Sequence, residues 1–350
     1  MTGPRLPAAR SLARLGWAMA TRRRLPFSMV FILTNRCNFQ CEYCNIPAQA
    51  GDEMSEAEFR RAIDELTALG MSRAAFSGGE VTIRRECAPL IGYAKSLGLF
   101  TSMNTNAWLS AAQIDELTPN LDMVVTSLDG PEDVHDEVRH RKGSYRRVMA
   151  SLERFLGSGV AVATITTLGP WNLPHVEWVL EQAERLGFFA YFQPAYEDCF
   201  HLEAGIHSTF DGATLDSIAA RLQVARASGR PVGSSPGYFE RLSRAPRFSD
   251  CGTCKAGIYF GTVLADGRVI PCHLTSEGAY LNGREVGFAR AFLEAPHPAS
   301  GPGCSVTPLV ENDLIFSLEP RAILAAARQI RAARRTAKPR AARGQPAAPA

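Results

Sequence analysis

Cys37-Asn-Phe-Gln-Cys41-Glu-Tyr-Cys44 stands just after the apolar run Met29-Val-Phe-Ile-Leu33, which is typical of a buried strand. Three cysteines with three and then two residues between them can turn their thiolates toward one point of a tight loop. Three thiolates satisfy three irons of a four-iron, four-sulfur cluster and leave the fourth iron without a protein ligand. A small molecule can coordinate that iron, so the spacing predicts a reactive [4Fe-4S] cluster at Cys37, Cys41 and Cys44.

Other uses of three cysteines fit this loop less well. A zinc knuckle usually takes four ligands in paired C-x2-C units, and no fourth ligand lies nearby in the sequence. A disulfide framework is disfavoured by the odd count of nine cysteines. A non-catalytic iron–sulfur or zinc protein that transfers electrons or binds a partner remains the alternative of a different class.

Composition indicates one large domain and a smaller one, because the chain has 350 residues of which 46% are hydrophobic. No apolar run approaches the ~20 residues that a membrane helix needs. The first residues lack the continuous apolar core of a signal peptide, so we expect the protein to lie in the cytoplasm. Oxygen-sensitive clusters can persist in that reducing compartment.

Both ends of the chain are basic, although the net charge is only +3. Residues 1–27 contain six arginines and no acid, and residues 321–350 contain eight basic side chains and no acid. The tail over 331–350 is rich in Ala, Arg and Pro, which predicts a disordered extension, and we expect no specific nucleic-acid partner. Leu12, Leu15 and Met19 fall at helical spacing, so the N-terminal segment is expected to lie on the body of the protein or, as the weaker interpretation, on a membrane surface.

Strand-like and helical patterns alternate from Ser28 onward. Ser55-Glu-Ala-Glu58 reads as a capping box that opens a helix ending at Gly70. The expected strands are 28–34, 73–77, 99–104, 121–128, 160–168 and 188–194. Six strands with intervening helices predict an α/β fold with a parallel sheet, and the chemistry of a parallel barrel collects at the carboxyl ends of its strands.

The cysteine spacing resembles the signature of the radical S-adenosylmethionine (radical SAM) enzymes. In that family S-adenosylmethionine (SAM) occupies the open iron, and an electron from the cluster cleaves its sulfonium to a 5′-deoxyadenosyl radical. The resemblance implies a partial (βα)6 TIM-like barrel and a reductant protein such as flavodoxin or ferredoxin. It also assigns SAM-binding roles, through the family's methionine-binding, ribose and adenine motifs, to Gly78, Gly79, Glu80, Asn104, Asn106 and Tyr43. Val81 departs from the family, which usually has proline there.

The stretch from Thr126 to Tyr145 resembles a motif of the radical SAM branch that carries extra clusters, which includes sulfatase-maturing, quinone-cofactor and peptide-modifying enzymes. In that branch a serine and an arginine hold the SAM carboxylate, which carries over onto Ser127 and Arg139. We expect Asp129 and Asp136 to serve turns and caps, and His135 to be structural. Leu168 to Asn172 is expected to form the outer wall of the SAM pocket.

A second cysteine group lies near the C-terminus. Residues 259–272 read as a β-hairpin with Asp266-Gly267 at its turn, and the spacing around it resembles the SPASM/twitch auxiliary-cluster domain of the same branch. The resemblance implies a second [4Fe-4S] cluster, in the shortened form of that domain, with the ligands Cys251, Cys254, Cys272 and Cys304. A zinc site from these cysteines is the alternative, and without Cys304 the auxiliary cluster would have an open iron.

The expected activity is oxidative modification of an unactivated C–H position, and the auxiliary cluster would take up the remaining substrate electron. From the branch, the first expectation for the substrate is a peptide, and a porphyrin, sugar or lipid precursor is the alternative. His273 stands where sulfatase-maturing enzymes have an aspartate base, which argues against that activity; it either takes a proton during substrate oxidation or is an inert neighbour. The expected organisation is a basic segment (1–27), a barrel (28–200), a helical linker (201–248), an auxiliary-cluster domain (249–310), a C-terminal helix (311–330) and a basic tail (331–350).

Overall fold

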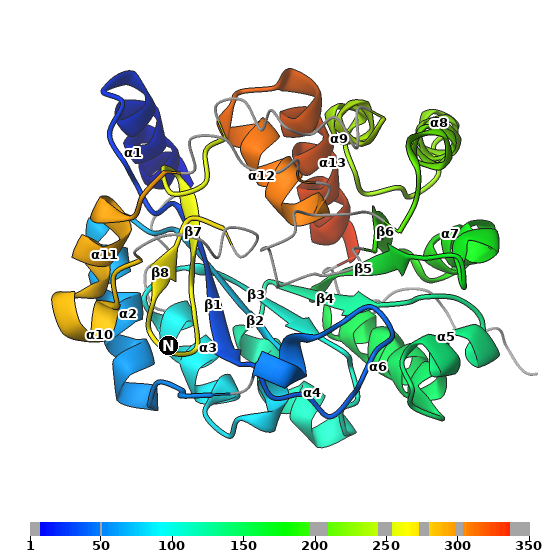
Figure 1. Ribbon diagram of the computed structural model, residues 1–350, viewed down its shortest axis with the longest axis horizontal. Coiled ribbons are helices and arrows are strands. Elements are labelled where there is room, and N and C mark those ends of the chain that lie inside the picture. Colours follow the sequence, from blue (N-terminus) through cyan, green and yellow to red (C-terminus); the bar gives the residue numbers. More distant parts are fainter. Residues whose placement is uncertain are drawn as a thin grey trace, which may run out of the picture.

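The computed structural model describes residues 8–49, 51–195, 209–243, 254–272, 280–297, 304 and 306–336. Its centre is an eight-stranded sheet in the order β6-β5-β4-β3-β2-β1-β7-β8 (Figure 1). The first six strands are parallel, and each lies within two residues of its predicted limits: β1 (Ser28–Thr34), β2 (Arg73–Gly78), β3 (Phe100–Thr105), β4 (Met123–Ser127), β5 (Ala161–Leu168) and β6 (Phe189–Pro194). The sheet is not closed, which confirms the partial barrel.

Helices connect these strands and cover the outer face of the sheet: α2 (Glu56–Leu69), α3 (Cys87–Ser96), α4 (Ala111–Leu117), α5 (Glu132–Val138), α6 (Ser144–Ser158) and α7 (Val176–Leu186). The predicted capping box is present, since Ser55 and Glu58 exchange hydrogen bonds at the start of α2. Pro174 lies in a separate 3-10 turn, Leu173–His175, immediately before α7.

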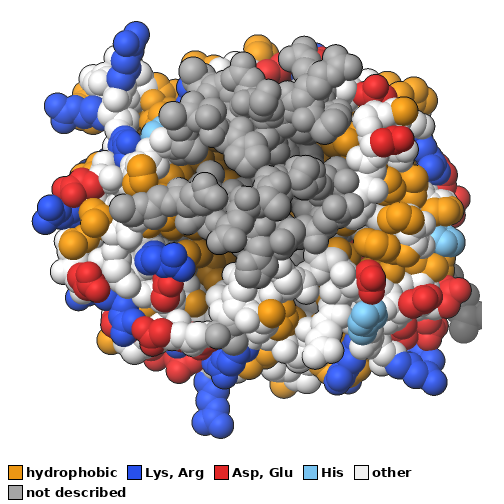
Figure 2. Space-filling model, in the orientation of Figure 1, with side chains coloured by type: hydrophobic (Ala, Val, Ile, Leu, Met, Phe, Trp, Pro, Cys, Tyr) orange, Lys and Arg blue, Asp and Glu red, His pale blue; other side chains and the backbone are white. Residues whose placement is uncertain are grey.

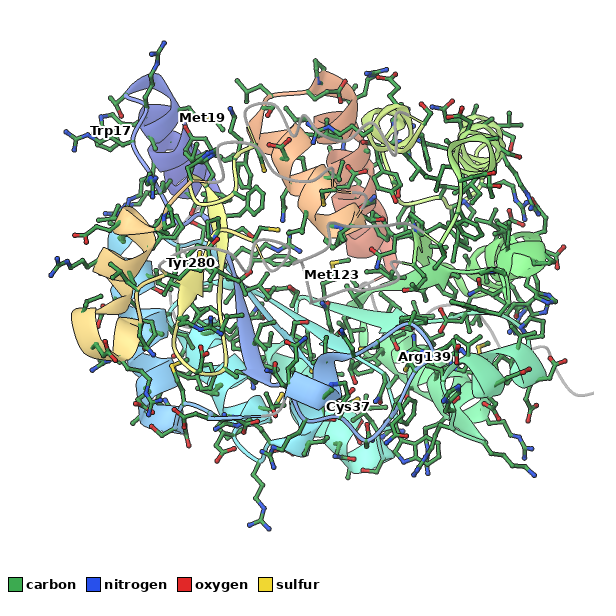
Figure 3. All side chains as sticks on the ribbon, in the orientation of Figure 1. Trp17, Met19, Cys37, Met123, Arg139 and Tyr280 are labelled. Atoms are coloured by element: carbon green, nitrogen blue, oxygen red, sulfur yellow. The ribbon has the colours of Figure 1, made fainter. Side chains whose placement is uncertain are left out.

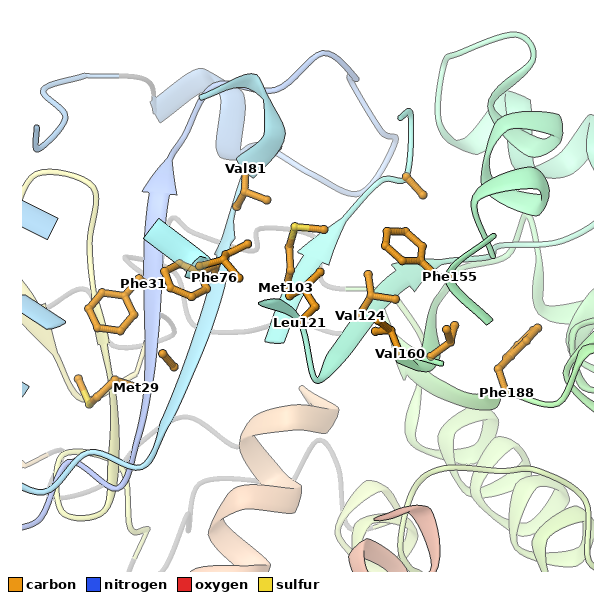
Figure 4. Close-up of a cluster of buried hydrophobic side chains, with 14 of the residues drawn as sticks. Met29, Phe31, Phe76, Val81, Met103, Leu121, Val124, Phe155, Val160 and Phe188 are labelled. Atoms are coloured by element: carbon orange, nitrogen blue, oxygen red, sulfur yellow. The ribbon is translucent and has the colours of Figure 1, made fainter. Parts of the chain in front are cut away.

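The core fills the space between the sheet and these helices (Figure 4). Alternate strand residues point into it, and Phe31 and Phe76 stack there with ring centroids 5.8 Å apart. Burying one such side chain contributes about 2 kcal/mol. The other alternate residues, such as Ile32, Ser77 and Met123, are partly exposed and face the concave side of the sheet. That side is therefore lined by the strands themselves.

The predicted C-terminal hairpin is confirmed, with β7 (Phe260–Val263) antiparallel to β8 (Val269–Ile270). Its place in the fold was not predicted. Strand β7 pairs in parallel with β1, and Ser28 lies opposite Phe260. The hairpin thus continues the barrel sheet, because the free edge of β1 offers unpaired backbone groups that a neighbouring strand satisfies.

The remaining helices are α8 (Gly212–Ala227), α9 (Pro236–Leu242), α10 (Gly283–Val286), α11 (Phe288–Glu294), α12 (Thr307–Phe316) and α13 (Pro320–Thr336). The sequence predicted one helix over 311–330, but the structure has two, because Leu318 is left-handed at φ 61° and Pro320 starts a new helix. Helix α13 continues to Thr336, within the segment expected to be disordered, and residues 337–350 lie outside the described residues.

Helix α1 (Ala8–Ala20) packs on the C-terminal part of the chain. Leu15, Ala18 and Met19 belong to a hydrophobic cluster with residues such as Phe316. Trp17 is 54% exposed on the other side of the helix (Figure 3), and basic side chains stand out over α1 (Figure 2). This contact agrees with the expectation that the helix lies on the protein body. Within the described residues, every helix is too short or too polar to span a membrane.

Candidate active site

The first cysteine loop leaves the carboxyl end of β1, as predicted. Cys37, Cys41 and Cys44 are partly exposed there, and the Cys44 N–H donates to the Cys41 carbonyl at 3.0 Å, which closes a tight turn. Burial raises the pKa of the Cys37 and Cys41 thiols. Cluster iron binds thiolates, so binding would release these protons. Across the described part of the chain, no three His, Cys, Asp or Glu side chains are grouped so as to hold a single metal ion.

Polar donors surround the cysteine sulfurs. Arg139 Nη1 lies 3.6 Å from Cys41 Sγ, and the Phe39 N–H lies 3.4 Å from Cys37 Sγ. Asn106 Nδ2 lies 4.0 Å from the same Cys37 sulfur. Hydrogen bonds to cluster sulfurs tune the reduction potential, so these donors fit a bound cluster. Figure 3 shows Cys37 and Arg139 at the same edge of the sheet.

Buried Arg84, which the sequence did not single out, fixes the two stems of this loop. Its Nη1 donates to the carbonyls of Leu33 and Met54, each at 2.9 Å. Arg36 completes the arrangement through an ion pair with Glu53 at 3.0 Å. No sequence motif marks Arg84, because its partners are backbone carbonyls brought together by folding.

Gly78 and Gly79 allow the loop after β2 to approach the cysteine loop. Gly78 has φ 151°, and a Cβ there would lie 2.2 Å from the Thr34 carbonyl oxygen. A Cβ on Gly79 would lie 2.3 Å from the Arg36 carbonyl oxygen. The Gly79 N–H donates to the Thr34 carbonyl at 2.8 Å. The sequence suggested an approach to a ligand; the structure shows that the glycines also serve an approach between two backbones.

We expect Gly79→Ala to destabilise the protein by about 3 kcal/mol, because the new methyl group must push backbone apart. The iron content of the purified Gly79→Ala variant should also be lower than that of the wild type. Anaerobic denaturant unfolding and iron analysis measure both effects. The matched control is Gly157→Ala in α6, where a Cβ meets nothing within 4 Å and helix propensity predicts a gain of about 0.5–1 kcal/mol. Equal stabilities of the two variants would contradict the proposed contact.

Glu80 is buried between the loops that follow β2 and β3. Its carboxylate accepts hydrogen bonds from Thr82 Oγ1 at 2.6 Å, Thr105 Oγ1 at 2.9 Å and the Asn106 N–H at 2.7 Å. Burial raises its pKa. Glu80 therefore joins the loops that follow β2 and β3, besides any role in binding a ligand. Asn104 lies near by, and its Nδ2 donates to Ser77 Oγ at 3.1 Å.

The motif after β4 forms a buried ion pair that the sequence did not predict. Arg139 Nε lies 2.7 Å from Asp129 Oδ2, and both side chains are buried. Tyr43 donates to the same Asp129 oxygen at 3.3 Å. The expectation that Asp129 serves a turn was wrong, because its carboxylate instead neutralises and orients the arginine. Ser127 ends β4 at the same edge of the sheet.

Arg139 Nη2 is buried and has no hydrogen-bond partner among the described residues. A buried guanidinium nitrogen without a partner is costly, so a ligand acceptor is expected there. A SAM carboxylate next to the cluster fits this need. The wall expected at residues 168–172 also fits, since Trp171 stacks on Tyr43 with centroids 6.5 Å apart.

His135 and Asp136 have the structural roles that the sequence predicted. Asp136 accepts from Ser144 Oγ at 2.8 Å and from the Tyr145 N–H at 2.7 Å at the start of α6. His135 Nδ1 accepts the Asp129 N–H at 3.1 Å, so the ring must be neutral at that nitrogen. Burial lowers the pKa of His135 to about 4.

The His135 pKa predicts how stability depends on pH. In the unfolded chain the pKa of His135 is about 6.5. As pH falls, the unfolded chain is therefore protonated before the folded protein, and the free energy of unfolding decreases between about pH 6.5 and about pH 4. The loss should reach about 3 kcal/mol. His135→Gln should show a smaller loss over this range than the wild type. Anaerobic denaturant unfolding at pH 7 and pH 5 measures the difference, and identical pH profiles would contradict it.

Cys254 and Cys272 of the second cysteine group lie at the opposite end of the sheet. Cys254 precedes β7, which runs parallel to β1, and Cys272 follows the antiparallel β8, so both lie at the amino end of β1. Cys272, Cys254 and Cys304 border the same hydrophobic cluster. The seven residues of β1 separate the two ends by roughly 20 Å. The predicted ligand Cys251 and the predicted proton acceptor His273 lie outside the described residues.

One peptide unit beside Cys254 is held from both sides. His297 Nε2 donates to the Cys254 carbonyl at 2.6 Å, and the Lys255 N–H donates to buried Asp313 at 2.8 Å. The other Asp313 oxygen pairs with Arg241 at 2.6 Å. These residues position the cysteine, and the sequence could not reveal them because they come from three separate segments.

Comparison with known proteins places the chain in a family. Residues 31–183 match the model of the radical SAM superfamily. PqqA peptide cyclase of Ruegeria pomeroyi is 30% identical over 264 residues, which cover 71% of this chain and 68% of that protein. The chain belongs to the radical SAM superfamily. This membership identifies it as an enzyme that depends on SAM and a [4Fe-4S] cluster, which argues against the non-catalytic interpretation.

Other proteins similar to this radical SAM enzyme match over a smaller part of their sequence or at lower identity. Fe-coproporphyrin III synthase of Methanosarcina barkeri is 30% identical over 45% of this chain and 40% of that protein. Among solved structures, Streptococcus suis SuiB bound to S-adenosylmethionine superposes with a TM-score of 0.65 at 15% identity, covering 83% of this chain and 70% of that chain. That likeness supports the barrel fold and its C-terminal extension.

Proposed function

We propose that this enzyme binds SAM against the cluster of Cys37, Cys41 and Cys44 and oxidatively modifies a C–H position of a peptide. The observation that carries the proposal is the unpartnered Nη2 of Arg139, on a side chain whose Nη1 already lies 3.6 Å from Cys41 Sγ. When bound, the cluster and SAM supply a 5′-deoxyadenosyl radical that removes a hydrogen atom from the substrate.

The protein's own residues prepare this site. Arg139 would present its unpartnered Nη2 to the SAM carboxylate, and Asp129 holds the guanidinium in place through Nε. Ser127 would assist Arg139, and Glu80 would receive the SAM ammonium group. Tyr43 and Trp171 offer stacked rings beside the cysteine loop, where the adenine would lie. The SAM ribose would lie near Asn104 and Asn106.

At the other end of the barrel, Cys254, Cys272, Cys304 and Cys251 would hold an auxiliary [4Fe-4S] cluster. Such a cluster would supply a one-electron acceptor, and His273 could accept the substrate proton. The concave face between the two ends would hold the substrate. A flavodoxin or ferredoxin would deliver the electron that SAM cleavage needs.

A peptide substrate is supported by two of the similar proteins. PqqA peptide cyclase is named for a peptide substrate, and SuiB has been solved bound to the precursor peptide SuiA. A tetrapyrrole is the second candidate, supported by the similarity to Fe-coproporphyrin III synthase.

Anaerobic reconstitution tests the proposal. The protein is loaded with iron and sulfide, then given dithionite and SAM. We expect methionine and 5′-deoxyadenosine in equal amounts, and iron and sulfide analysis should give about eight of each per chain for two clusters. Binding of SAM without any cleavage under reduction would refute the proposed chemistry. About four irons would refute the auxiliary cluster only.

A further inference from the structure

Arg73 is the only charged residue in the six parallel strands β1 to β6. It is the first residue of β2, and its neighbours Ala74 and Phe76 point into the core behind the sheet. Side chains alternate between the two faces of a strand, so Arg73 points to the concave face. The rest of that face, along all six strands, is uncharged.

This arginine has no acidic partner in the part of the chain that the structure describes. Its Nε is fully buried and makes no hydrogen bond, although the residue as a whole is only half-buried. Burial lowers its pKa, yet an arginine remains charged at neutral pH. A buried guanidinium nitrogen without a hydrogen-bond partner is unusual in a folded protein. Arg73 therefore has bonding capacity that the resting protein leaves unused.

An aromatic side chain lies beside Arg73. Its guanidinium carbon lies 5.4 Å from the ring of Phe100, its register partner on β3. Phe100 is 40% exposed, which is unusual for a phenylalanine within a sheet. An unpaired cation beside an exposed ring is a surface suited to an anion attached to an apolar group.

We propose that Arg73 binds a carboxylate of the substrate on the concave face, so that the enzyme selects anionic substrates. This inference rests on the proposed function. It places the arginine at the amino end of β2, the same end of the barrel as the second cysteine group, while SAM would bind at the carboxyl end. The substrate would then lie between the two cysteine sites with its acidic group held away from the cleavage site. The carboxylate comes from an acidic peptide side chain or from the propionate of a tetrapyrrole.

Arg73→Met tests the assignment without a known substrate. Methionine keeps the length and the apolar stem but removes the unpaired charge, so the melting temperature of the anaerobic holoenzyme should stay the same or rise. The matched control is Arg146→Met, whose side chain is 74% exposed and pairs with Glu132; its melting temperature should hardly change. A fall in melting temperature for Arg73→Met, well beyond that of the control, would show a structural role and overturn the proposal.

Binding of defined probes identifies the source of the carboxylate. The probes are coproporphyrin III and its tetramethyl ester, and the peptides acetyl-Ala-Glu-Tyr-Ala-amide and acetyl-Ala-Gln-Tyr-Ala-amide. We expect one of the two acids to bind the wild type more tightly than its neutral counterpart, and Arg73→Met to weaken that acid by roughly 10–100-fold. Tighter binding of the porphyrin acid indicates a tetrapyrrole, and tighter binding of the glutamate peptide indicates a peptide. Equal binding of acid and neutral forms, or no binding of any probe, overturns the proposal.

A separate measurement tests the proposed function. Formation of 5′-deoxyadenosine by the wild type measures SAM cleavage and does not depend on these probes. If cleavage is absent, the proposed function fails whatever Arg73 binds. If cleavage is present and the probes fail, only the role of Arg73 is overturned.

Discussion

Cys41→Ala is expected to reduce 5′-deoxyadenosine formation to the background of a protein without the first cluster. Removal of one thiolate leaves two ligands on the loop, which cannot hold the cluster against loss of iron. The iron content should fall by about four per chain, and any auxiliary cluster should remain. Anaerobic purification, iron analysis and chromatographic measurement of 5′-deoxyadenosine test this expectation.

Cys87→Ala is the matched control for this experiment. Cys87 is a buried thiol in α3 and belongs to the hydrophobic core, so it is a packing residue. Its replacement should leave the iron content unchanged. If Cys41→Ala keeps the iron and the cleavage activity, the assignment of the cysteine loop is wrong.

Asp129→Ala is expected to destabilise the protein by about 3–5 kcal/mol, because it leaves the buried guanidinium of Arg139 without its counter-charge. Arg139→Met should cost a similar amount, since it leaves the fully buried Asp129 carboxylate alone. The double variant should cost much less than the sum, because neither charge is then left uncompensated. Denaturant unfolding under anaerobic conditions measures the three values.

Measurement of SAM affinity distinguishes the binding role of Arg139 from the contribution of the Asp129–Arg139 pair to stability. Arg139→Met should weaken SAM by roughly 10–100-fold, and the more stable double variant should remain equally weak. The exposed pair Arg146–Glu132 is the control, since its removal should change stability by about 0.5 kcal/mol at most. Additive costs for Asp129 and Arg139, or a double variant that binds SAM normally, would contradict the assigned roles.

Local sequence patterns predicted most of the barrel. The capping box at Ser55, the alternation of strands and helices and the Asp266-Gly267 turn each depend on residues close together in the chain. Sequence reasoning failed where a residue's partner lies outside its own turn, helix or strand. Asp129 looked like a turn residue until folding placed Arg139 beside it. The hydrogen bonds of Asp313 and His297 to the peptide unit beside Cys254 could not be predicted for the same reason.

The sequence by itself determined the chemistry of this protein, because cysteine spacing, strand order and the residues that follow each strand are local properties of the chain. Only the tertiary structure decided how those parts are used. Pairing of β7 with β1 puts Cys254 and Cys272 at the end of the sheet opposite the first cysteine loop. Between these ends, Arg73 is the one charged residue that strands β1 to β6 place on the concave face. The physical reason is that strand pairing and charge compensation depend on which segments meet in space.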